Sequence, residues 1–154
     1  LPIGKAEVLR TGGDVAILAI GATVAPALEA AKELAARDIA ATVVNARFAK
    51  PLDSALVLDL ANRIRRVATV EENTLGGGFG SSVADLRQKS GITDVKVKSL
   101  GLPDAYIEHG TQVILRAKYG LDAKGITNQV LSLFPALNAG SLPKVKSEAK
   151  TISH

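Results

Sequence analysis

The stretch that decides the fold is residues 15–45, which read VAILAIGATVAPALEAAKELAARDIAATVVN. It begins with a short aliphatic run at 15–20 and ends with another at 39–45, and such runs are typical of buried strands. The apolar residues between the two runs recur at helical spacing: Leu28, Ala31, Leu34 and Ala35. A strand, a helix and a second strand in this order predict two parallel strands joined by a right-handed crossover.

The first two predicted helices have recognisable starts. Thr23 is a candidate N-cap, and Pro26 falls in the first turn, where its missing N–H does no harm. Asp53 is the predicted N-cap of the second helix. The apolar stripe of that helix consists of Leu56, Leu60 and Ile64. Three cations lie around its carboxyl end, where the helix dipole favours them: Arg63, Arg65 and Arg66.

Two more strands and three more helices follow along the chain. Residues 67–71 and 95–100 are β-branched runs that predict strands. Helices are predicted over residues 81–91, 111–120 and 122–134. The residues that predict the ends of these helices are Ser81 or Ser82, Gly91, Thr111, Gly120, Asp122 and Phe134.

The sequence therefore predicts an α/β domain of three layers around a mostly parallel sheet of about five strands. Residues 5–10 alternate in character, and the turn at Gly12 and Gly13 predicts that they return beside Val15 as an antiparallel edge strand. The domain is expected to cover residues 1–137. Residues 138–154 show no periodicity and are predicted to be a flexible tail.

Composition excludes several classes of function. The chain has 154 residues and no Cys, so disulfides and thiolate catalysis are excluded. Of its two His, His154 is the last residue, and His109 is interpreted as a polar loop residue rather than a metal ligand. The net charge is +4 and about half of it lies in the tail, so no nucleic-acid partner is expected. Neither a signal peptide nor a membrane span is expected, and the absence of Met suggests a fragment.

A glycine-rich turn lies in residues 67–83, VATVEENTLGGGFGSSV. One interpretation is a phosphate cradle at the start of a helix. The other is a turn that packs closely against a neighbouring domain or subunit. The second is favoured, because neither of the usual glycine-rich phosphate-binding patterns can be spelled from these residues.

Ligands of open parallel sheets bind beyond the carboxyl ends of the strands, which directs attention to residues 21–23, 45–53 and 71–80. Adjacent acids at a strand end point in opposite directions, so Glu71 and Glu72 are not expected to face one substrate. One acid is predicted to cap or pair, and the other to reach an interface. Arg47 could hold a phosphate or pair with an acid of its own domain. Tyr106 and His109 lie in a polar loop with no second base nearby in the sequence, so they do not form a catalytic set.

Three separated motifs then carry a family resemblance over about residues 2–131. They are AIG with RFAKPLD, then EENTLGGGFGS, then GLPDAYIEHG with GLDAKGI. In this order they resemble the C-terminal domain of the 1-deoxy-D-xylulose-5-phosphate synthases, within the transketolase-like enzymes. Residues 138–154 match no recognised motif.

The resemblance implies a transferase that condenses pyruvate with glyceraldehyde 3-phosphate, losing CO₂, in isoprenoid, thiamine and pyridoxal phosphate biosynthesis. It implies thiamine diphosphate and Mg²⁺ in the full-length enzyme, held by upstream domains through a G-D-G motif that this chain lacks. The fragment alone is expected to be inactive and to bind no cofactor. Its expected partners are the upstream domains of its own chain and a homodimer partner, in the bacterial cytoplasm or in a plastid.

The resemblance assigns no catalytic, cofactor-binding or metal-binding residue to this chain. The chain is expected to support the dimer of the full-length enzyme. Two alternatives are the C-terminal domain of another transketolase-like enzyme, such as a 2-oxoacid dehydrogenase β subunit, and a free-standing anion- or nucleotide-binding module. The candidates for domain and subunit contact are Arg47, Asp53, Glu71, Glu72, Gly76, Gly77, Gly78, Phe79 and Gly80.

Overall fold

A computed structural model describes residues 3–47, 51–72, 78–92, 94–100 and 120–138. Five strands form one sheet in the order β1-β3-β2-β4-β5. The strands are β1 (Glu7–Arg10), β2 (Val15–Ala19), β3 (Ala41–Asn45), β4 (Arg66–Val70) and β5 (Lys96–Leu100). β1 runs antiparallel to β3, and the other neighbouring pairs are parallel. This confirms the α/β class, the mostly parallel sheet and the antiparallel edge strand.

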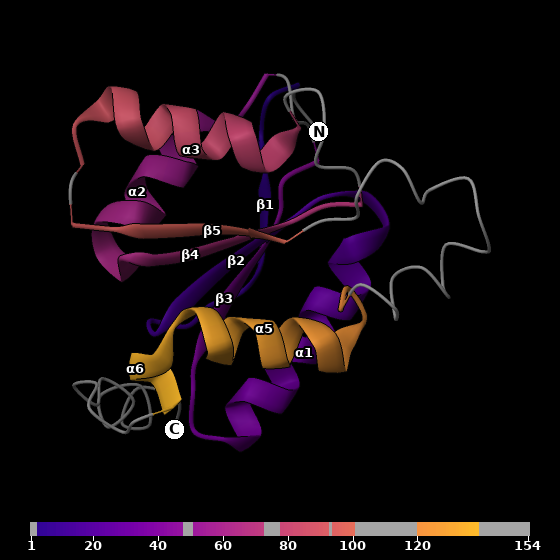
Figure 1. The fold of residues 1–154 in the computed structure, drawn as a ribbon. Helices are drawn as coiled ribbons and strands as arrows, with labels where there is room; N and C mark the ends of the chain where they lie inside the picture. The colour runs from indigo at the N-terminus through magenta and orange to yellow at the C-terminus, as the bar shows by residue number, and fades with distance from the viewer. Residues whose placement is uncertain (1–2, 48–50, 73–77, 93, 101–119, 139–154) are drawn as a thin grey trace, which may run out of the picture.

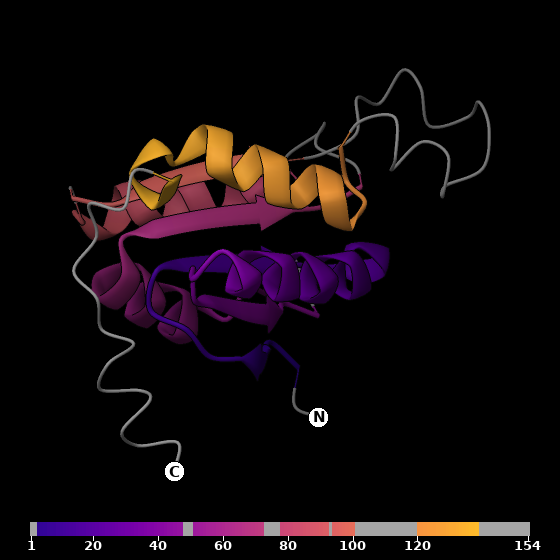
Figure 2. The same ribbon diagram turned by 90° about the horizontal axis from the view of Figure 1, so that it is seen from below.

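Helices cover both faces of the sheet and complete the three layers (Figures 1 and 2). One face carries α1 (Val24–Ala36), α5 (Ala123–Leu133) and the short α6 (Pro135–Asn138). The other face carries α2 (Ser54–Ile64) and α3 (Phe79–Ser90). A single 3-10 turn, η1 (Gly21–Thr23), leads from β2 into α1.

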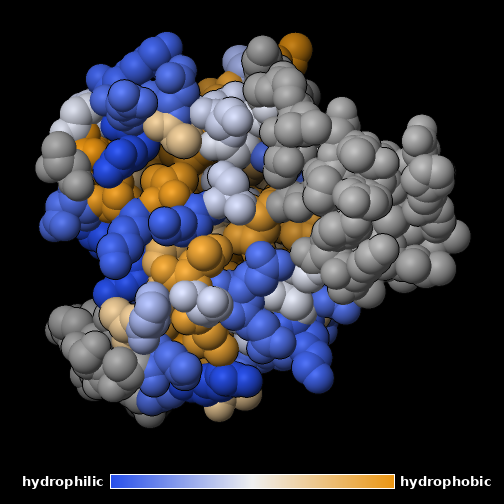
Figure 3. Space-filling view, in the orientation of Figure 1, coloured by the Kyte–Doolittle hydropathy of each residue, from blue (hydrophilic) through white to orange (hydrophobic). Residues whose placement is uncertain are grey.

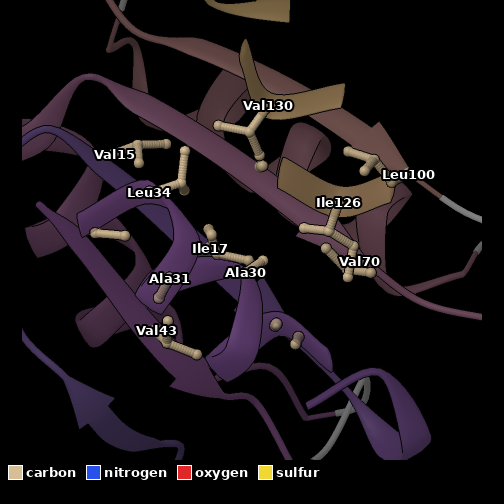
Figure 4. Packing of buried hydrophobic residues seen from close by; sticks show 14 of the residues in the cluster. Val15, Ile17, Ala30, Ala31, Leu34, Val43, Val70, Leu100, Ile126 and Val130 are labelled. Atoms are coloured by element: carbon tan, nitrogen blue, oxygen red, sulfur yellow. The ribbon is translucent and has the colours of Figure 1, made fainter. Parts of the chain in front are cut away.

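The alternation of side chains along the strands separates two apolar cores. On β2, Val15 and Ile17 face α1 and α5, whereas Ala16 and Leu18 face α2 and α3. Figure 4 shows the first core, where Leu34 of α1 and Val130 of α5 meet the sheet. Because β2 is buried along its whole length, its sequence is continuously apolar rather than alternating.

The predicted helix ends are confirmed where they depend on local chemistry. Asp53 caps α2 by accepting a hydrogen bond from the Leu56 N–H at 3.3 Å. Asp122 caps α5 in the same way through the Gly125 N–H at 2.8 Å. Gly91 ends α3 in the left-handed conformation, with a φ of 80°.

Three expectations are corrected. The first strand pairs with β3 and not beside Val15, because β2 is already flanked by β3 and β4. The link from β1 to β2 crosses the amino end of β3, where the Gly12 N–H binds the Thr42 hydroxyl at 2.9 Å. Thr23 occupies the N-cap position of α1, as predicted, but its side chain makes no cap hydrogen bond to that helix. Finally, α3 begins at Phe79, ahead of Ser81.

Several predictions fall outside the described residues. These are the helix over 111–120, the loop that carries Tyr106 and His109, the glycines Gly76 and Gly77, and the tail beyond residue 138. Within the described residues, no helix combines the length and apolarity needed to cross a bilayer.

Candidate functional site

The carboxyl edge of the sheet gathers the three loops that the sequence indicated. The sheet hydrogen bonding continues just past the strand ends. The Ile20 N–H binds the Val70 carbonyl at 3.2 Å, and the Ala46 N–H binds the Ala19 carbonyl at 2.8 Å. The starts of these loops are therefore held by the same backbone pairing that builds the sheet.

Glu71 joins the end of β4 to the start of α3. Its side chain is 5% exposed, and Oε1 accepts a hydrogen bond from the Phe79 N–H at 2.9 Å. Oε2 accepts the neighbouring N–H, that of Gly80. A carboxylate suits this position, because the first N–H groups of a helix have no intrahelical partner and carry partial positive charge. The prediction that one of the paired acids acts as a cap is thus confirmed for Glu71.

Gly80 lies where a larger residue would collide with the sheet. A Cβ added there would lie 2.5 Å from Ser99 Oγ, 2.8 Å from Thr69 Oγ1 and 3.0 Å from Glu71 Oε2. Thr69 and Ser99 are themselves joined across β4 and β5, with Thr69 Oγ1 donating to Ser99 Oγ at 3.0 Å. The glycine therefore allows α3 to start in close contact with two strands of its own domain.

This arrangement bears on the phosphate-cradle interpretation of the turn. The N–H groups of Phe79 and Gly80, which an anion would use, are already bound to Glu71. The Ser82 N–H binds the Gly78 carbonyl within the helix. An incoming phosphate would also meet the negative charge of Glu71, so the described part of the turn favours packing over anion binding.

A second carboxylate, Asp53, fastens the N-terminal segment to the same edge. Besides capping α2, Asp53 accepts the Ala6 N–H at Oδ2 with a distance of 2.9 Å. Arg47 adds a parallel tie, since its Nη1 donates to the Lys5 carbonyl at 3.3 Å. Arg47 has a φ of 63°, and its own N–H is held by the Asn45 side chain at 3.0 Å.

The side chain of Thr23 joins two segments of this edge instead of capping α1. Its hydroxyl donates toward the Ile20 carbonyl at 2.7 Å and the Val70 carbonyl at 3.0 Å, and the side chain is fully buried. It thereby links the loop after β2 to the end of β4. The short η1 turn places Thr23 in the helical conformation already, so its side chain points back toward the sheet.

The structure also places three other residues that the sequence proposed for domain or subunit contact: Phe79, Gly78 and Glu72. Phe79 is 2% exposed and packs in the core beside Val83, while Gly78 is the N-cap position of α3. Glu72 has interactions within the chain. Sequence reasoning missed Thr69 and Ser99, because their contact with Gly80 joins segments with no local signal. Among the described residues, no three His, Asp or Glu side chains form a group that could hold a metal ion.

Comparison with known proteins agrees with this architecture. Residues 4–126 match the family described as transketolase, C-terminal domain. The chain therefore belongs to the transketolase C-terminal domain family.

Similar curated proteins include 1-deoxy-D-xylulose-5-phosphate synthases. The chain is 58% identical over 130 residues to 1-deoxy-D-xylulose-5-phosphate synthase 1 of Geobacter metallireducens, covering 84% of this chain and 21% of the relative. It is 49% identical over 151 residues to the 1-deoxy-D-xylulose-5-phosphate synthase of a Synechococcus species, covering 96% and 23%. The chain thus spans about a fifth of the length of the curated relatives it matches.

Solved structures show the same fold. A split gene transketolase, described as an inactive β4 tetramer, superposes with a TM-score of 0.78 at 37% identity, over 88% of this chain and 44% of that chain. The transketolase of Campylobacter jejuni gives a TM-score of 0.57 at 20% identity, over 84% of this chain and 18% of that one. The second likeness extends to the fold alone.

Proposed function

We propose that this chain serves as the C-terminal domain of a 1-deoxy-D-xylulose-5-phosphate synthase and supports the dimer that builds the active sites. The observation that carries the proposal is the identity of 45–58% to synthases over most of this chain. These relatives favour the synthase over the alternative of a 2-oxoacid dehydrogenase β subunit. The whole enzyme would condense pyruvate with glyceraldehyde 3-phosphate in the cytoplasm.

The two carboxylates of the carboxyl edge do not fit Mg²⁺, the metal of such an enzyme. Mg²⁺ takes several oxygen ligands in near-octahedral geometry. The carboxylates at the carboxyl edge, Glu71 and Asp53, instead accept backbone N–H groups on both oxygens. We therefore assign no step of the reaction to this chain, and propose that thiamine diphosphate and Mg²⁺ bind to other domains of the full-length enzyme.

A role in assembly is supported by the related split gene transketolase, whose chain is described as an inactive β4 tetramer. At the carboxyl edge, Arg47, Glu72 and Gly78 are proposed to contact another domain or subunit. Glu71, Phe79 and Gly80 are buried, so they are proposed to act by fixing the backbone that presents this contact.

The first test uses the 154-residue chain alone. Isothermal titration with thiamine diphosphate, with and without Mg²⁺, beside a coupled assay with pyruvate and glyceraldehyde 3-phosphate, should show neither Mg²⁺-dependent binding nor turnover. Measurable turnover, or micromolar binding of the coenzyme that requires Mg²⁺, would show that the chemistry lies in this domain.

The second test joins this chain to the remainder of the Geobacter metallireducens synthase in place of the matching segment. We expect an active dimer, because the two segments are 58% identical. A Gly78→Val change in the chimera should impair assembly, whereas Gly13→Val, at a glycine with open space around it, should not. A chimera that dimerises but lacks synthase activity would contradict the proposed family role.

A further inference from the structure

The amino edge of the sheet contains a groove of about 570 Å³ that the proposed function does not use. It lies where β4 and β5 begin, between the end of α3 and the Phe134–Ala136 segment. Figure 3 shows hydrophilic residues interleaved with hydrophobic ones over the band between α3 and α5, where Figure 1 places β5. The groove is lined by four cations and one acid: Arg65, Arg66, Arg87, Lys96 and Asp94.

Two of the cations lie side by side on neighbouring strands of the sheet. Arg66 and Lys96 are register partners on the parallel strands β4 and β5, so their side chains leave the same face of the sheet. Like charges in such neighbouring positions repel and destabilise the pair. Among the described residues, the Arg66 side chain donates only to the Asp14 carbonyl, at 3.5 Å, and the Lys96 ammonium has no hydrogen-bond or ion-pair partner.

The single acid does not neutralise this pair. Asp94 forms an ion pair with Arg65 at 3.2 Å, and its side chain is 90% exposed. An ion pair so exposed to water compensates little charge beyond its own two members. The groove therefore keeps an excess of positive charge on Arg66, Arg87 and Lys96.

The guanidinium group of Arg87 has one buried nitrogen without a hydrogen-bond acceptor. Its Nη2 donates to the Val95 carbonyl at 3.2 Å. Its Nε is buried and has no hydrogen-bond partner, alone among the buried side-chain nitrogens and oxygens of the described residues. Such orphaned donors are rare in folded proteins and call for an explanation.

Helix dipoles explain only part of this cluster. Arg87 lies in the last turn of α3, where a cation is stabilised by the helix end. Arg66 and Lys96 lie on strands, where no helix end favours them. The groove also continues into a second hollow lined by Arg87, Lys96 and Lys98, which extends the positive surface along β5.

We propose that this groove binds a small phosphate-bearing anion of the size of a di- or triphosphate. The anion's oxygens would accept hydrogen bonds from Arg66 and Lys96, relieving their repulsion. With a change of rotamer toward the groove, Arg87 would give its Nε an acceptor as well. This site lies at the opposite edge of the sheet from Glu71 and does not depend on the proposed synthase role.

The test is titration of the 154-residue chain with inorganic pyrophosphate, followed by calorimetry and by backbone amide NMR shifts. We expect saturable binding, with shifts clustered at the amino ends of β4 and β5. Lys96→Gln and Arg66→Gln should each weaken binding by about tenfold, since each removes a charge-assisted bond. Arg63→Gln is the matched control, because that cation pairs with Asp59 on exposed α2 and does not line the groove.

A stability measurement keeps the test decisive. At one fixed concentration, pyrophosphate should raise the Tm of the unsubstituted chain and of Arg63→Gln by more than it raises that of Lys96→Gln, as mass action requires of a ligand of the folded state. Lys96 is exposed, so its variant should fold. The proposal is overturned by absent binding, by shifts confined to the tail lysines Lys144, Lys146 and Lys150, or by equal weakening in the control.

Discussion

At the carboxyl edge of the sheet, Glu71 and Asp53 each place both carboxylate oxygens on backbone N–H groups. At the amino edge, Arg66 and Lys96 lie side by side, and the one acid in the groove pairs with Arg65. The carboxylates of the carboxyl edge are thus already bound within the domain, whereas the cations of the amino edge remain available to a ligand. Charged residues near strand ends therefore mark a ligand site only when their partners do not already lie within the chain.

The largest effect is expected from Glu71→Ala. The change leaves two buried N–H groups without acceptors, and bonds to a charged group contribute roughly 1.5–3 kcal/mol each, so the loss should be about 3 kcal/mol or more. Glu71→Gln should lose about half as much, because its amide oxygen still accepts one bond. The free energy of unfolding from urea denaturation measures both.

The control for this prediction is Glu29→Ala. Glu29 is exposed and pairs with Lys32 on the surface of α1, so its loss should stay within about 0.5 kcal/mol. Equal losses of unfolding free energy at Glu71 and Glu29 would show that the hydrogen bonds of Glu71 do not stabilise the carboxyl edge.

The next effect is expected from Gly80→Ala. The added methyl group would lie 2.5 Å from Ser99 Oγ and 2.8 Å from Thr69 Oγ1, and overpacking of this kind costs about 1–3 kcal/mol. Gly13→Ala is the matched control, because nothing lies within 4 Å of its added Cβ. Thermal unfolding of both variants compares them. A Gly80→Ala chain as stable as the control would contradict the close contact.

A smaller effect should separate the two aspartate caps. Asp122→Ala removes one cap bond and should cost about 1 kcal/mol. Asp53→Ala removes its cap bond and the tie to the Ala6 N–H, and should cost about 2 kcal/mol. Amide hydrogen exchange at Ala6 should also accelerate in the Asp53 variant alone. Unchanged exchange there would mean that the N-terminal segment is held by other contacts.

The smallest effect is expected at the amino edge, from Lys96→Gln without added anion. Removing one of two facing like charges should leave stability unchanged or raise it by up to about 0.5 kcal/mol. Raising the salt concentration should shrink any difference, because exposed charges are screened. A clear loss of stability in chemical denaturation would show that Lys96 has a structural partner. The charges of both edges would then be bound within the domain, and the two edges would not differ in this respect.

The sequence by itself determined the features that depend on neighbours along the chain. The buried strands follow from continuous apolar runs such as residues 15–19, and the caps at Asp53 and Asp122 follow from side chains that reach N–H groups three residues ahead. The family, too, is readable from ordered motifs, and the match over residues 4–126 confirms it.

Only the tertiary structure decided the contacts between distant segments. The place of β1 beside β3, the packing of Gly80 against Thr69 and Ser99, and the repulsive pairing of Arg66 with Lys96 all join residues far apart in the chain. Thr23 shows the same limit, since the local pattern predicts a side-chain cap but its hydroxyl binds the carbonyl of Val70, at the end of β4. Local chemistry specifies where an element begins and ends, whereas strand order specifies which side chains meet, and strand order is settled only when the sheet assembles.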